Sequence, residues 1–190
     1  MRKQVIYEEP GQIPEDKRIA GEQIVLRPIT YADTEDIVRW RNNPAIRDYF
    51  VFRETFTREM HEQWLNTRVA AGHVVQWIIC EGAGNMMRSV GSVYLRDIDP
   101  EEGRAEYGIF IGEQDATGKG YAREAARLVL RYAFDVLQLC VVGLRVFADN
   151  ERAKKGYLDA GFLPVRTLRD VKSTDGAAGD MLWMEASTGI

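Results

Sequence analysis

The sequence is poor in the residues that build disulfide frameworks and metal sites. Its 190 residues include only two cysteines, Cys80 and Cys140, and two histidines, His61 and His73. Both cysteines lie in apolar runs, which predicts two small, reduced residues in the core. There is no C-x-x-C pair, and the histidines are not spaced as metal ligands. The sequence therefore predicts neither a disulfide-stapled fold nor a metal site.

Long apolar runs and an excess of basic charge are also missing. No stretch approaches the roughly 20 apolar residues that cross a bilayer, and the N-terminal segment has no signal-peptide core. Lys and Arg number 25 against 29 Asp and Glu, a net charge of −4. Non-specific nucleic-acid binding needs a basic surface, which this balance does not supply. We expect a cytoplasmic protein with neither a membrane nor a nucleic-acid partner.

The remaining composition is that of an ordinary globular chain, with 45% hydrophobic and 28% charged residues. A length of 190 residues favours one domain. The first 20 or so residues are charged and are interrupted by Pro10, Gly11, Pro14 and Gly21. We expect an N-terminal arm at 1–22 that covers an edge of a single domain at 23–190.

Hydrophobic periodicity predicts the element order β-α-α-β-β-β-α-β-α-β-β. The expected strands are 24–28, 74–80, 89–95, 105–111 and 141–147, with two more around a turn at 173–176. Helices are expected after Thr30, from about Thr57, over 118–137 and after Asn150, and a hairpin turn at 82–85. A three-strand meander followed by a strand–helix–strand crossover predicts an α/β fold of the α+β type. Its mixed central sheet should have about seven strands, with helices on both faces.

The segment Gln114–Ala122 joins an apolar strand to the longest expected helix. We expect Gly118 and Gly120 in the first helical turn, where each costs up to about 1 kcal/mol relative to alanine. Lys119 and Arg123 place cations at the positive end of the helix dipole. A bound phosphate would account for both features, because glycines open the backbone N–H groups to it. The alternative is a glycine-bearing turn with a solvated lysine; neither a P-loop nor a dinucleotide fingerprint is present.

A second motif follows the next strand. Asn150 is a good helix N-cap, and Ala153 and Tyr157 lie on one face of that helix. The G-x-G loop followed by N-x-x-A-x-x-x-Y-x-x-x-G-F resembles the GNAT superfamily of acyl-CoA-dependent N-acyltransferases. The resemblance covers Ile24 to Glu185 and is closest to branches that acetylate ribosomal proteins or UDP-linked aminosugars. The chain departs from the family at Asp115, where Gln or Arg is preferred, and at Gly156, a position usually apolar.

The resemblance implies a GNAT fold in which acetyl-CoA lies between splayed parallel strands, 107–111 and 141–147, with no metal ion. The pantetheine arm would pair with the backbone of the first strand like an added strand and be held by Asn150. The pyrophosphate would rest on the N–H groups of residues 117–122. The implied cofactor-binding residues are Ile109, Phe110, Ile111, Thr117, Gly118, Lys119, Gly120, Tyr121, Ala122 and Asn150.

Two proton transfers define the chemistry that this implies. An amine with a pKa near 10.4 must lose a proton, and a thiolate with a pKa near 8.5 must be stabilised as it leaves. We predict that Tyr157 protonates the thiolate and that Glu106 is the base, directly or through water. The alternatives are a packed aromatic and an ion-paired strand carboxylate. Because no Ser–His–Asp or Cys–His arrangement competes, direct attack by the amine is favoured over an acyl-enzyme.

The acceptor is indicated by two short motifs, W-R-N at Trp40–Asn42 and E-x-H-x-x-W at Glu59–Trp64. They resemble two related branches, one that acetylates UDP-linked aminosugars and one that acetylates ribosomal-protein N-termini. The resemblance to the aminosugar branch implies that Arg41 and His61 contact nucleotide phosphates. Arg41 could equally be a helix C-terminal cation, and His61 a partly buried helix residue. We predict acetylation of a primary amine on a nucleotide-linked aminosugar. The alternative acceptors are ribosomal-protein or peptide N-termini and polyamines. The non-enzyme alternative is a module that senses acyl-CoA without turnover. A homodimer is left open.

Overall fold

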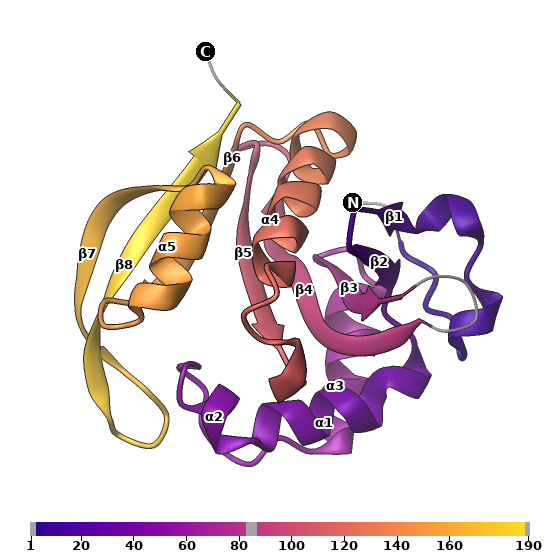
Figure 1. Ribbon diagram of the computed structural model, residues 1–190, viewed down its shortest axis with the longest axis horizontal. Coiled ribbons are helices and arrows are strands. Elements are labelled where there is room, and N and C mark those ends of the chain that lie inside the picture. The colour runs from indigo at the N-terminus through magenta and orange to yellow at the C-terminus, as the bar shows by residue number, and fades with distance from the viewer. Residues whose placement is uncertain (1–2, 83–86, 189–190) are drawn as a thin grey trace.

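The computed structural model describes residues 3–82 and 87–188. Within them the chain forms one mixed sheet of eight strands in the order β1-β2-β3-β4-β5-β6-β8-β7 (Figure 1). The strands are β1 Ile19–Ala20, β2 Ile24–Pro28, β3 Val74–Glu81, β4 Arg88–Asp99, β5 Arg104–Ile111, β6 Val141–Phe147, β7 Leu163–Lys172 and β8 Ala178–Ser187. The predicted α/β class is confirmed. The expected hairpin turn at 82–85 lies outside the described residues, apart from Gly82.

The strand beyond the expected seven is β1, which comes from the N-terminal arm. It pairs antiparallel with β2, Ile19 opposite Leu26 and Ala20 opposite Val25, and so covers that edge of the sheet. Ile13, also in the arm, is 3% exposed. The arm is further tied to the rest of the chain where the N–H groups of Glu22 and Gln23 donate to the Glu124 carboxylate.

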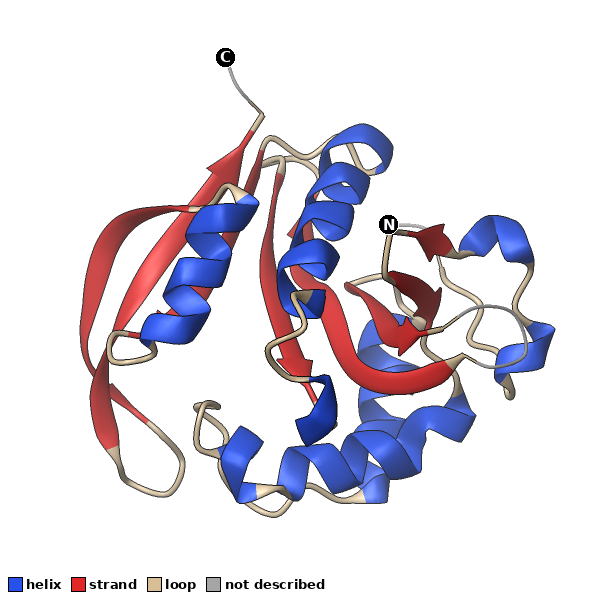
Figure 2. Ribbon diagram, viewed as in Figure 1, coloured by secondary structure: helices blue, strands red, loops and turns tan. Residues whose placement is uncertain are grey.

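Helices cover both faces of the sheet (Figure 2). The α-helices are α1 Thr34–Asn42, α2 Pro44–Arg47, α3 Arg58–Trp64, α4 Tyr121–Arg131 and α5 Glu151–Ala160. Short 3-10 turns are η1 Pro10–Gln12, η2 Glu15–Lys17, η3 Tyr31–Asp33 and η6 Gln114–Ala116, and π-helical turns η4 Leu65–Val69 and η7 Tyr132–Val136 extend α3 and α4. The helix expected over 118–137 therefore starts three residues later and ends in a π turn.

Alternation along the strands divides the core in two. On β3, Ile79 belongs to the cluster under α4, whereas Ile78 and Cys80 belong to the cluster under α1 and η4. On β5, Tyr107 joins the first cluster and Phe110 the second. Each large apolar side chain buried this way contributes about 1.5–3 kcal/mol. Successive residues of one strand thus present side chains to two different layers of helices.

The one parallel pair of the sheet, β5 with β6, holds only at its beginning. The paired residues are Arg104–Glu106 with Val141–Gly143, and beyond Glu106 the two strands separate. β6 continues to pair with β8 as far as Phe147, and β5 with β4 as far as Ile111. The predicted splay between these strands is confirmed, and it opens the middle of the sheet between α4 and α5.

Two further features differ from or add to the sequence predictions. Cys80 is buried, as expected, but Cys140 is exposed, because it lies in the turn between η7 and β6 rather than within the strand.

Buried Arg27 and Asp33 form an ion pair with N–O distances of 2.5 and 2.8 Å, which joins β2 to η3. Among the described residues, no helix is long and apolar enough to cross a membrane.

Candidate active site

A cavity of about 1490 Å³ lies where β5 and β6 part. It extends from the loop before α4 and the start of α5 to the helices α1–α3. All of the site residues predicted from the sequence line this cavity. The structure thus brings the cofactor candidates, Tyr157 and Glu106, and the acceptor candidates Arg41 and His61 to one continuous space.

The wall of the cavity formed by β5 has an open backbone edge. From Tyr107 to Ile111 no β6 residue pairs with it, so the peptide groups on that edge can accept an added strand-like ligand. The side chain of Phe110 turns away from that edge, with its ring 6.1 Å from Trp40 and 5.7 Å from Phe50. Ile109 and Ile111 pack against the core cluster under α4. An amide-containing chain such as pantetheine fits this edge through main-chain hydrogen bonds.

The glycines of the predicted phosphate loop do not lie inside the helix. Gly118 has φ 79° and Gly120, the N-cap of α4, has φ 87°. The helix begins at Tyr121, so the expected loss of helix propensity is not incurred, and glycine is needed instead for the left-handed backbone. A Cβ at Gly118 would meet nothing within 4 Å, and one at Gly120 only the ends of Arg123 and Gln23. The loop therefore leaves open space in front of the free N–H groups of the first helical turn, which suits a phosphate.

Carboxylates offset some of the cations near this loop. Lys119 Nζ lies 3.3 Å from Glu81, and the Tyr121 hydroxyl donates to the same carboxylate at 2.9 Å. These contacts hold the pKa of Glu81 below its usual range, and the hydrogen bond from Tyr121 has the largest effect. Asp115, the departure from the family pattern, forms two hydrogen bonds with Arg88, at 2.6 and 2.9 Å. Asp115 therefore fixes the loop to the start of β4 instead of facing a phosphate.

The start of α5 supplies further polar groups. Asn150 Oδ1 accepts a hydrogen bond from the Ala153 N–H at 3.1 Å and caps the helix, as predicted. In the part of the chain that the structure describes, its amide nitrogen has no protein partner, nor do the charged groups of Arg152 and Lys155, which also line the cavity. These donors fit a ligand that carries several phosphates and an amide-containing arm, as acetyl-CoA does.

Tyr157 lines the cavity, half-buried within an aromatic cluster. Its ring packs edge-on against Tyr107 at 6.2 Å and against Phe162 at 5.9 Å. Burial raises the pKa of Tyr157 above its ordinary value. The phenol is therefore protonated throughout the neutral range, and it is a weaker acid than the ordinary value near 10 suggested. A hydrogen bond to a developing thiolate is the interaction it supplies most readily.

Glu106 is held by two arginines that the sequence reasoning missed. Its Oε1 accepts from Arg96 Nη2 at 2.6 Å and from Arg145 Nε at 3.0 Å, and its Oε2 accepts from Arg145 Nη2 at 3.1 Å. A carboxylate oxygen has two lone pairs, so Oε2 keeps one acceptor position. The carboxylate is thus ion-paired, the alternative stated above, and it retains one site for an amine proton.

The part of the cavity lined by the acceptor candidates Arg41 and His61, which we name the acceptor end, contains an unusual guanidinium. Arg41 lies over the ring of Phe50, 3.7 Å from its centroid, and 5.0 Å from that of Phe56. Its Nε is buried without a hydrogen-bond partner, and no carboxylate among the described residues pairs with it. Burial lowers the pKa of Arg41 from an ordinary value far above neutrality, so it remains charged. Arg41 is half-buried, and a cation that has lost part of its hydration without gaining an anion is costly unless a ligand supplies one.

His61 is 1% exposed, more buried than the partly buried residue considered from the sequence. Its Nδ1 lies 3.0 Å from Thr34 Oγ1, and its Nε2 has no partner among the described residues. Burial lowers the pKa of His61 to about 4, so the imidazole is neutral at pH 7. Any contact with a phosphate would be made by a neutral ring.

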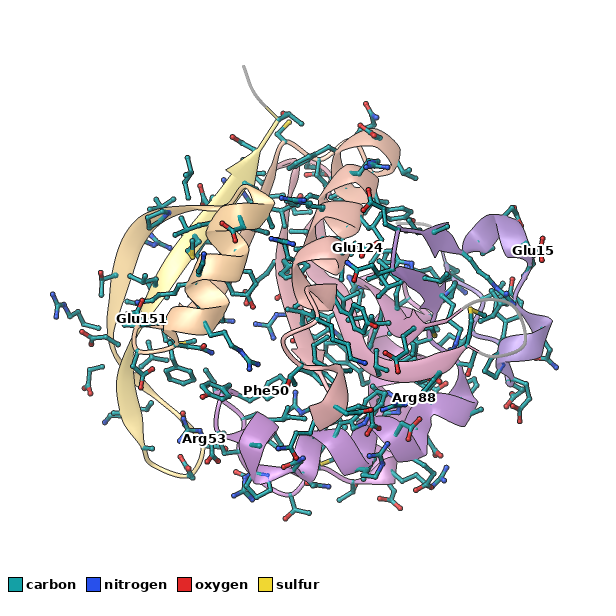
Figure 3. All side chains as sticks on the ribbon, viewed as in Figure 1. Glu15, Phe50, Arg53, Arg88, Glu124 and Glu151 are labelled. Carbon is teal, nitrogen blue, oxygen red and sulfur yellow. The ribbon has the colours of Figure 1, made fainter. Side chains whose placement is uncertain are left out.

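The far side of the acceptor end is closed by contacts between two distant segments, which we name the clasp: Val51–Arg53 with Thr174–Asp175. The Thr174 N–H donates to the Val51 carbonyl at 2.9 Å, and the Arg53 N–H donates to Thr174 Oγ1 at 2.9 Å. Arg53 also reaches Asp175 at 3.4 Å. Figure 3 shows Phe50 and Arg53 in the region between α2 and the β7–β8 hairpin. Val51, Phe52 and Thr174 line the cavity, so the clasp forms part of its wall.

Sequence signals for the missed residues were weak. Arg145 is the only charged residue in the apolar run 141–147, which marks it in retrospect, but nothing local connects it to Glu106. Tyr107, whose ring is buried beside Tyr157, resembled any core aromatic. Among residues 3–82 and 87–188, no three His, Cys, Asp or Glu side chains are grouped to hold a metal ion.

Comparisons with known proteins agree with this geometry. A family model described as an acetyltransferase (GNAT) domain matches residues 23–163. A spermidine N(1)-acetyltransferase of Escherichia coli is 28% identical over 148 residues, covering 75% of this chain and 74% of its own. An uncharacterized protein of Methanocaldococcus jannaschii is 31% identical over 149 residues, 78% of this chain, but this chain spans only 30% of that protein's length.

Among solved structures, the spermidine N-acetyltransferase from Vibrio cholerae in complex with CoA and spermine superimposes with a TM-score of 0.80. The match covers 88% of this chain and 96% of that chain at 24% identity, which shows a common fold. Acetyl-CoA is the acetyl donor of this fold family, and the open strand edge and glycine loop described above fit it. The family model spans most of the chain, and the chain belongs to the GNAT acetyltransferases.

Proposed function

We propose that this enzyme transfers an acetyl group from acetyl-CoA directly to a primary amine on a small acceptor that also carries an anionic group. A nucleotide-linked aminosugar is the candidate of this class. The observation that carries the proposal is Arg41, a half-buried guanidinium whose Nε is buried without a hydrogen-bond partner and which has no anionic partner among the described residues; it lies at the acceptor end of the cavity. A phosphate or carboxylate of the acceptor would supply the missing charge.

The charges around the acceptor end support an anion over a polycation. Arg41, Arg96 and Arg145 line it, against the single carboxylate of Glu106, which already binds two of the three. Among the described cavity-lining residues, the only other carboxylate is that of Asp159, on α5 beside Arg123. A polyamine would have to place several ammonium groups beside these guanidinium groups, which Coulomb repulsion disfavours.

Spermidine is nevertheless the second candidate, because relatives with that activity are similar to this chain. On the comparisons alone, the polyamine alternative is better supported than the aminosugar expected first from the sequence. A peptide N-terminus is the third candidate. The clasp disfavours it, since a protein acceptor would need an open path at the end that Val51 and Thr174 close.

In the proposed mechanism acetyl-CoA supplies an activated acetyl group, and the chain supplies position and proton transfer. Tyr157 donates its hydroxyl proton toward the departing sulfur. Glu106 accepts the amine proton at the free position of Oε2, directly or through water. Arg96 and Arg145 keep the carboxylate oriented. The bound amine must lose its proton against a pKa near 10.4, a cost of about 4.6 kcal/mol at pH 7.

The test is a parallel assay of wild-type enzyme with acetyl-CoA and three acceptors: a UDP-linked 4-amino sugar, spermidine and a short peptide, with acetylated products detected by mass spectrometry. Arg41→Ala should raise KM for the nucleotide sugar by about 10- to 100-fold, because a charged hydrogen bond is worth about 1.5–3 kcal/mol. KM for acetyl-CoA should stay within twofold. Arg58→Ala, an exposed arginine on α3 outside the cavity, is the control.

Acetylation of spermidine but not of the nucleotide sugar would reject the anionic acceptor and select the polyamine. If Arg41→Ala raised KM for acetyl-CoA as much as KM for the nucleotide sugar, Arg41 would not belong to the acceptor site. Acetyl-CoA binding without transfer to any amine would leave only the acyl-CoA-sensing alternative.

The proposal includes the remaining organisation of the molecule. Residues 23–190 form one catalytic domain and residues 1–22 an arm, a division supported by the start of the family match at residue 23. A homo-oligomer is proposed because a Vibrio cholerae relative is dodecameric, and light scattering tests it. The cytoplasmic location stays a prediction.

A further inference from the structure

The hydroxyl of Tyr107 is a buried titratable group of the cavity that the mechanism above leaves unused. Tyr107 is 3% exposed, and its hydroxyl oxygen is buried with no hydrogen-bond partner among the described residues. Native proteins leave few buried polar atoms unsatisfied, because each lacks the water it would otherwise bind. A phenylalanine would pack the same ring without that cost. The hydroxyl therefore calls for a role that packing alone does not give.

The position of Tyr107 places it beside the reaction centre. It follows Glu106, the last β5 residue that pairs with β6, and so lies where the two strands begin to part. Its ring is nearly perpendicular to that of Tyr157, at 87°, and packs at 5.6 Å on Phe162. Both tyrosines line the cavity. The two phenols come from opposite sides of the opening, one from β5 and one from α5.

Tyr157 needs help of the kind that a second phenol gives. Burial raises the pKa of Tyr157, so a proton leaving its hydroxyl leaves behind a poorly solvated phenolate. Burial also raises the pKa of Tyr107 well above its usual value, so its hydroxyl keeps its own proton and can donate a hydrogen bond to an anion. Of the other groups facing this pair, Tyr94 is a further phenol that lines the cavity, and Arg96 and Arg145 are engaged with Glu106.

We propose that Tyr107 is a positioning residue whose hydroxyl donates a hydrogen bond to Tyr157 Oη, directly or through one water, while Tyr157 gives its proton to the departing sulfur. The inference rests on the proposed function, in which Tyr157 is the proton donor. As the carbon–sulfur bond breaks, the electron pair stays on sulfur and the proton of Tyr157 moves to it. The amine loses a proton to Glu106 and thence to water, and Tyr157 regains one from water. Tyr107 keeps its proton throughout.

The experiment is a double-mutant cycle of Tyr107→Phe and Tyr157→Phe, with kcat followed as release of the CoA thiol. The substrates are acetyl-CoA and whichever of the three assay amines the wild type acetylates fastest. Tyr107→Phe should lower kcat by about 10- to 100-fold, the value of a hydrogen bond to a charged group, with KM for acetyl-CoA within twofold. Its melting temperature should stay the same or rise, because an unsatisfied polar atom has been removed.

The double variant should be no slower than Tyr157→Phe, since Tyr107 acts only through Tyr157. Tyr132→Phe is the matched control. Tyr132 is a half-buried phenol that packs edge-on against Trp77 at 5.0 Å, lies outside the cavity and should leave kcat unchanged. These three results together support the proposal.

Wild-type kcat in Tyr107→Phe, or losses that multiply in the double variant, would overturn it. A change confined to KM for acetyl-CoA would also overturn it, because it would mean a binding contact. Failure of the proposed function looks different. If Tyr157→Phe keeps the full kcat, Tyr157 is not the proton donor, and the role proposed for Tyr107 is lost with it. If Tyr157→Phe is slow but Tyr107→Phe keeps the full kcat, only the role of Tyr107 is rejected.

Discussion

Replacing Gly120 by alanine should separate two roles of the loop before α4. The first role is conformational, because φ at Gly120 is 87°, where an L-residue loses about 1–2 kcal/mol. For a domain of this size each kcal/mol lowers the melting temperature by about 2–4 °C, so we expect a loss of about 2–8 °C. Crowding should add little, since the new Cβ meets only Arg123 and Gln23, at 3.7 and 3.9 Å.

The second role is acetyl-CoA binding. At a concentration 100 times Kd, acetyl-CoA should stabilise the wild-type protein by about 2.7 kcal/mol, or roughly 5–11 °C. Turning the backbone at Gly120 reorients the N–H groups at the helix start and places a methyl group in the loop, so most of that rise should vanish. Differential scanning calorimetry with and without acetyl-CoA measures both quantities in one experiment.

Gly161→Ala is the matched control. Gly161 is the C-cap of α5 with φ 106°, and a Cβ there would meet nothing within 4 Å, but it does not line the cavity. It should lose similar stability and keep the full rise with acetyl-CoA. The reasoning is refuted if Gly120→Ala retains the wild-type rise, or if Gly161→Ala loses it as well.

Two further predictions concern buried charges. Asp33→Asn should lower the free energy of unfolding, measured in urea, by about 3–5 kcal/mol, because it leaves Arg27 as a buried cation without its partner. The control is Asp36→Asn, in an exposed pair with Arg39, which should change the free energy of unfolding by less than about 1 kcal/mol. An equally small loss in Asp33→Asn would mean that water replaces Asp33 as the partner of Arg27. Because the pKa of His61 falls from 6.5 unfolded to about 4 folded, its neutral form is favoured in the fold, and stability should be lost as the pH drops from 6.5 to 4. This loss of unfolding free energy, about 3 kcal/mol between pH 6.5 and 4, should be absent in His61→Gln and unchanged in His73→Gln when each is unfolded in urea at a series of pH values. If His61→Gln loses stability with falling pH as steeply as the wild type, groups other than His61 cause the loss.

Much of the fold followed from local patterns in the sequence. Apolar runs located the long strands, and Asn150 and Gly161 marked the two ends of α5, as the structure confirms. The splay of β5 and β6 came from the family resemblance and not from any local pattern. The strand β1 was missed because two residues carry no periodicity, and pairing with β2 defines it.

The errors arose where local sequence does not determine the outcome. Gly118 and Gly120 were expected inside α4, because composition cannot tell a glycine in a helix from one in the left-handed turn before it. The candidate site residues were found together in one cavity, but their partners were not foreseen. Glu106 and Arg145 are 39 positions apart, and their contact exists only because β5 and β6 are neighbours in the sheet.

The clasp has a consequence for how acceptor binding spreads through the molecule. Val51 and Thr174 lie 123 positions apart, so this wall of the cavity is shared between the helical N-terminal region and the last hairpin. An acceptor that touches both sides favours the closed pairing, and by thermodynamic linkage the closed pairing raises affinity for the acceptor by the same factor. In the proposed acceptor site, the amide of Thr174 should therefore report acceptor occupancy: we expect its hydrogen exchange to slow when the acceptor binds and to change less when acetyl-CoA binds alone.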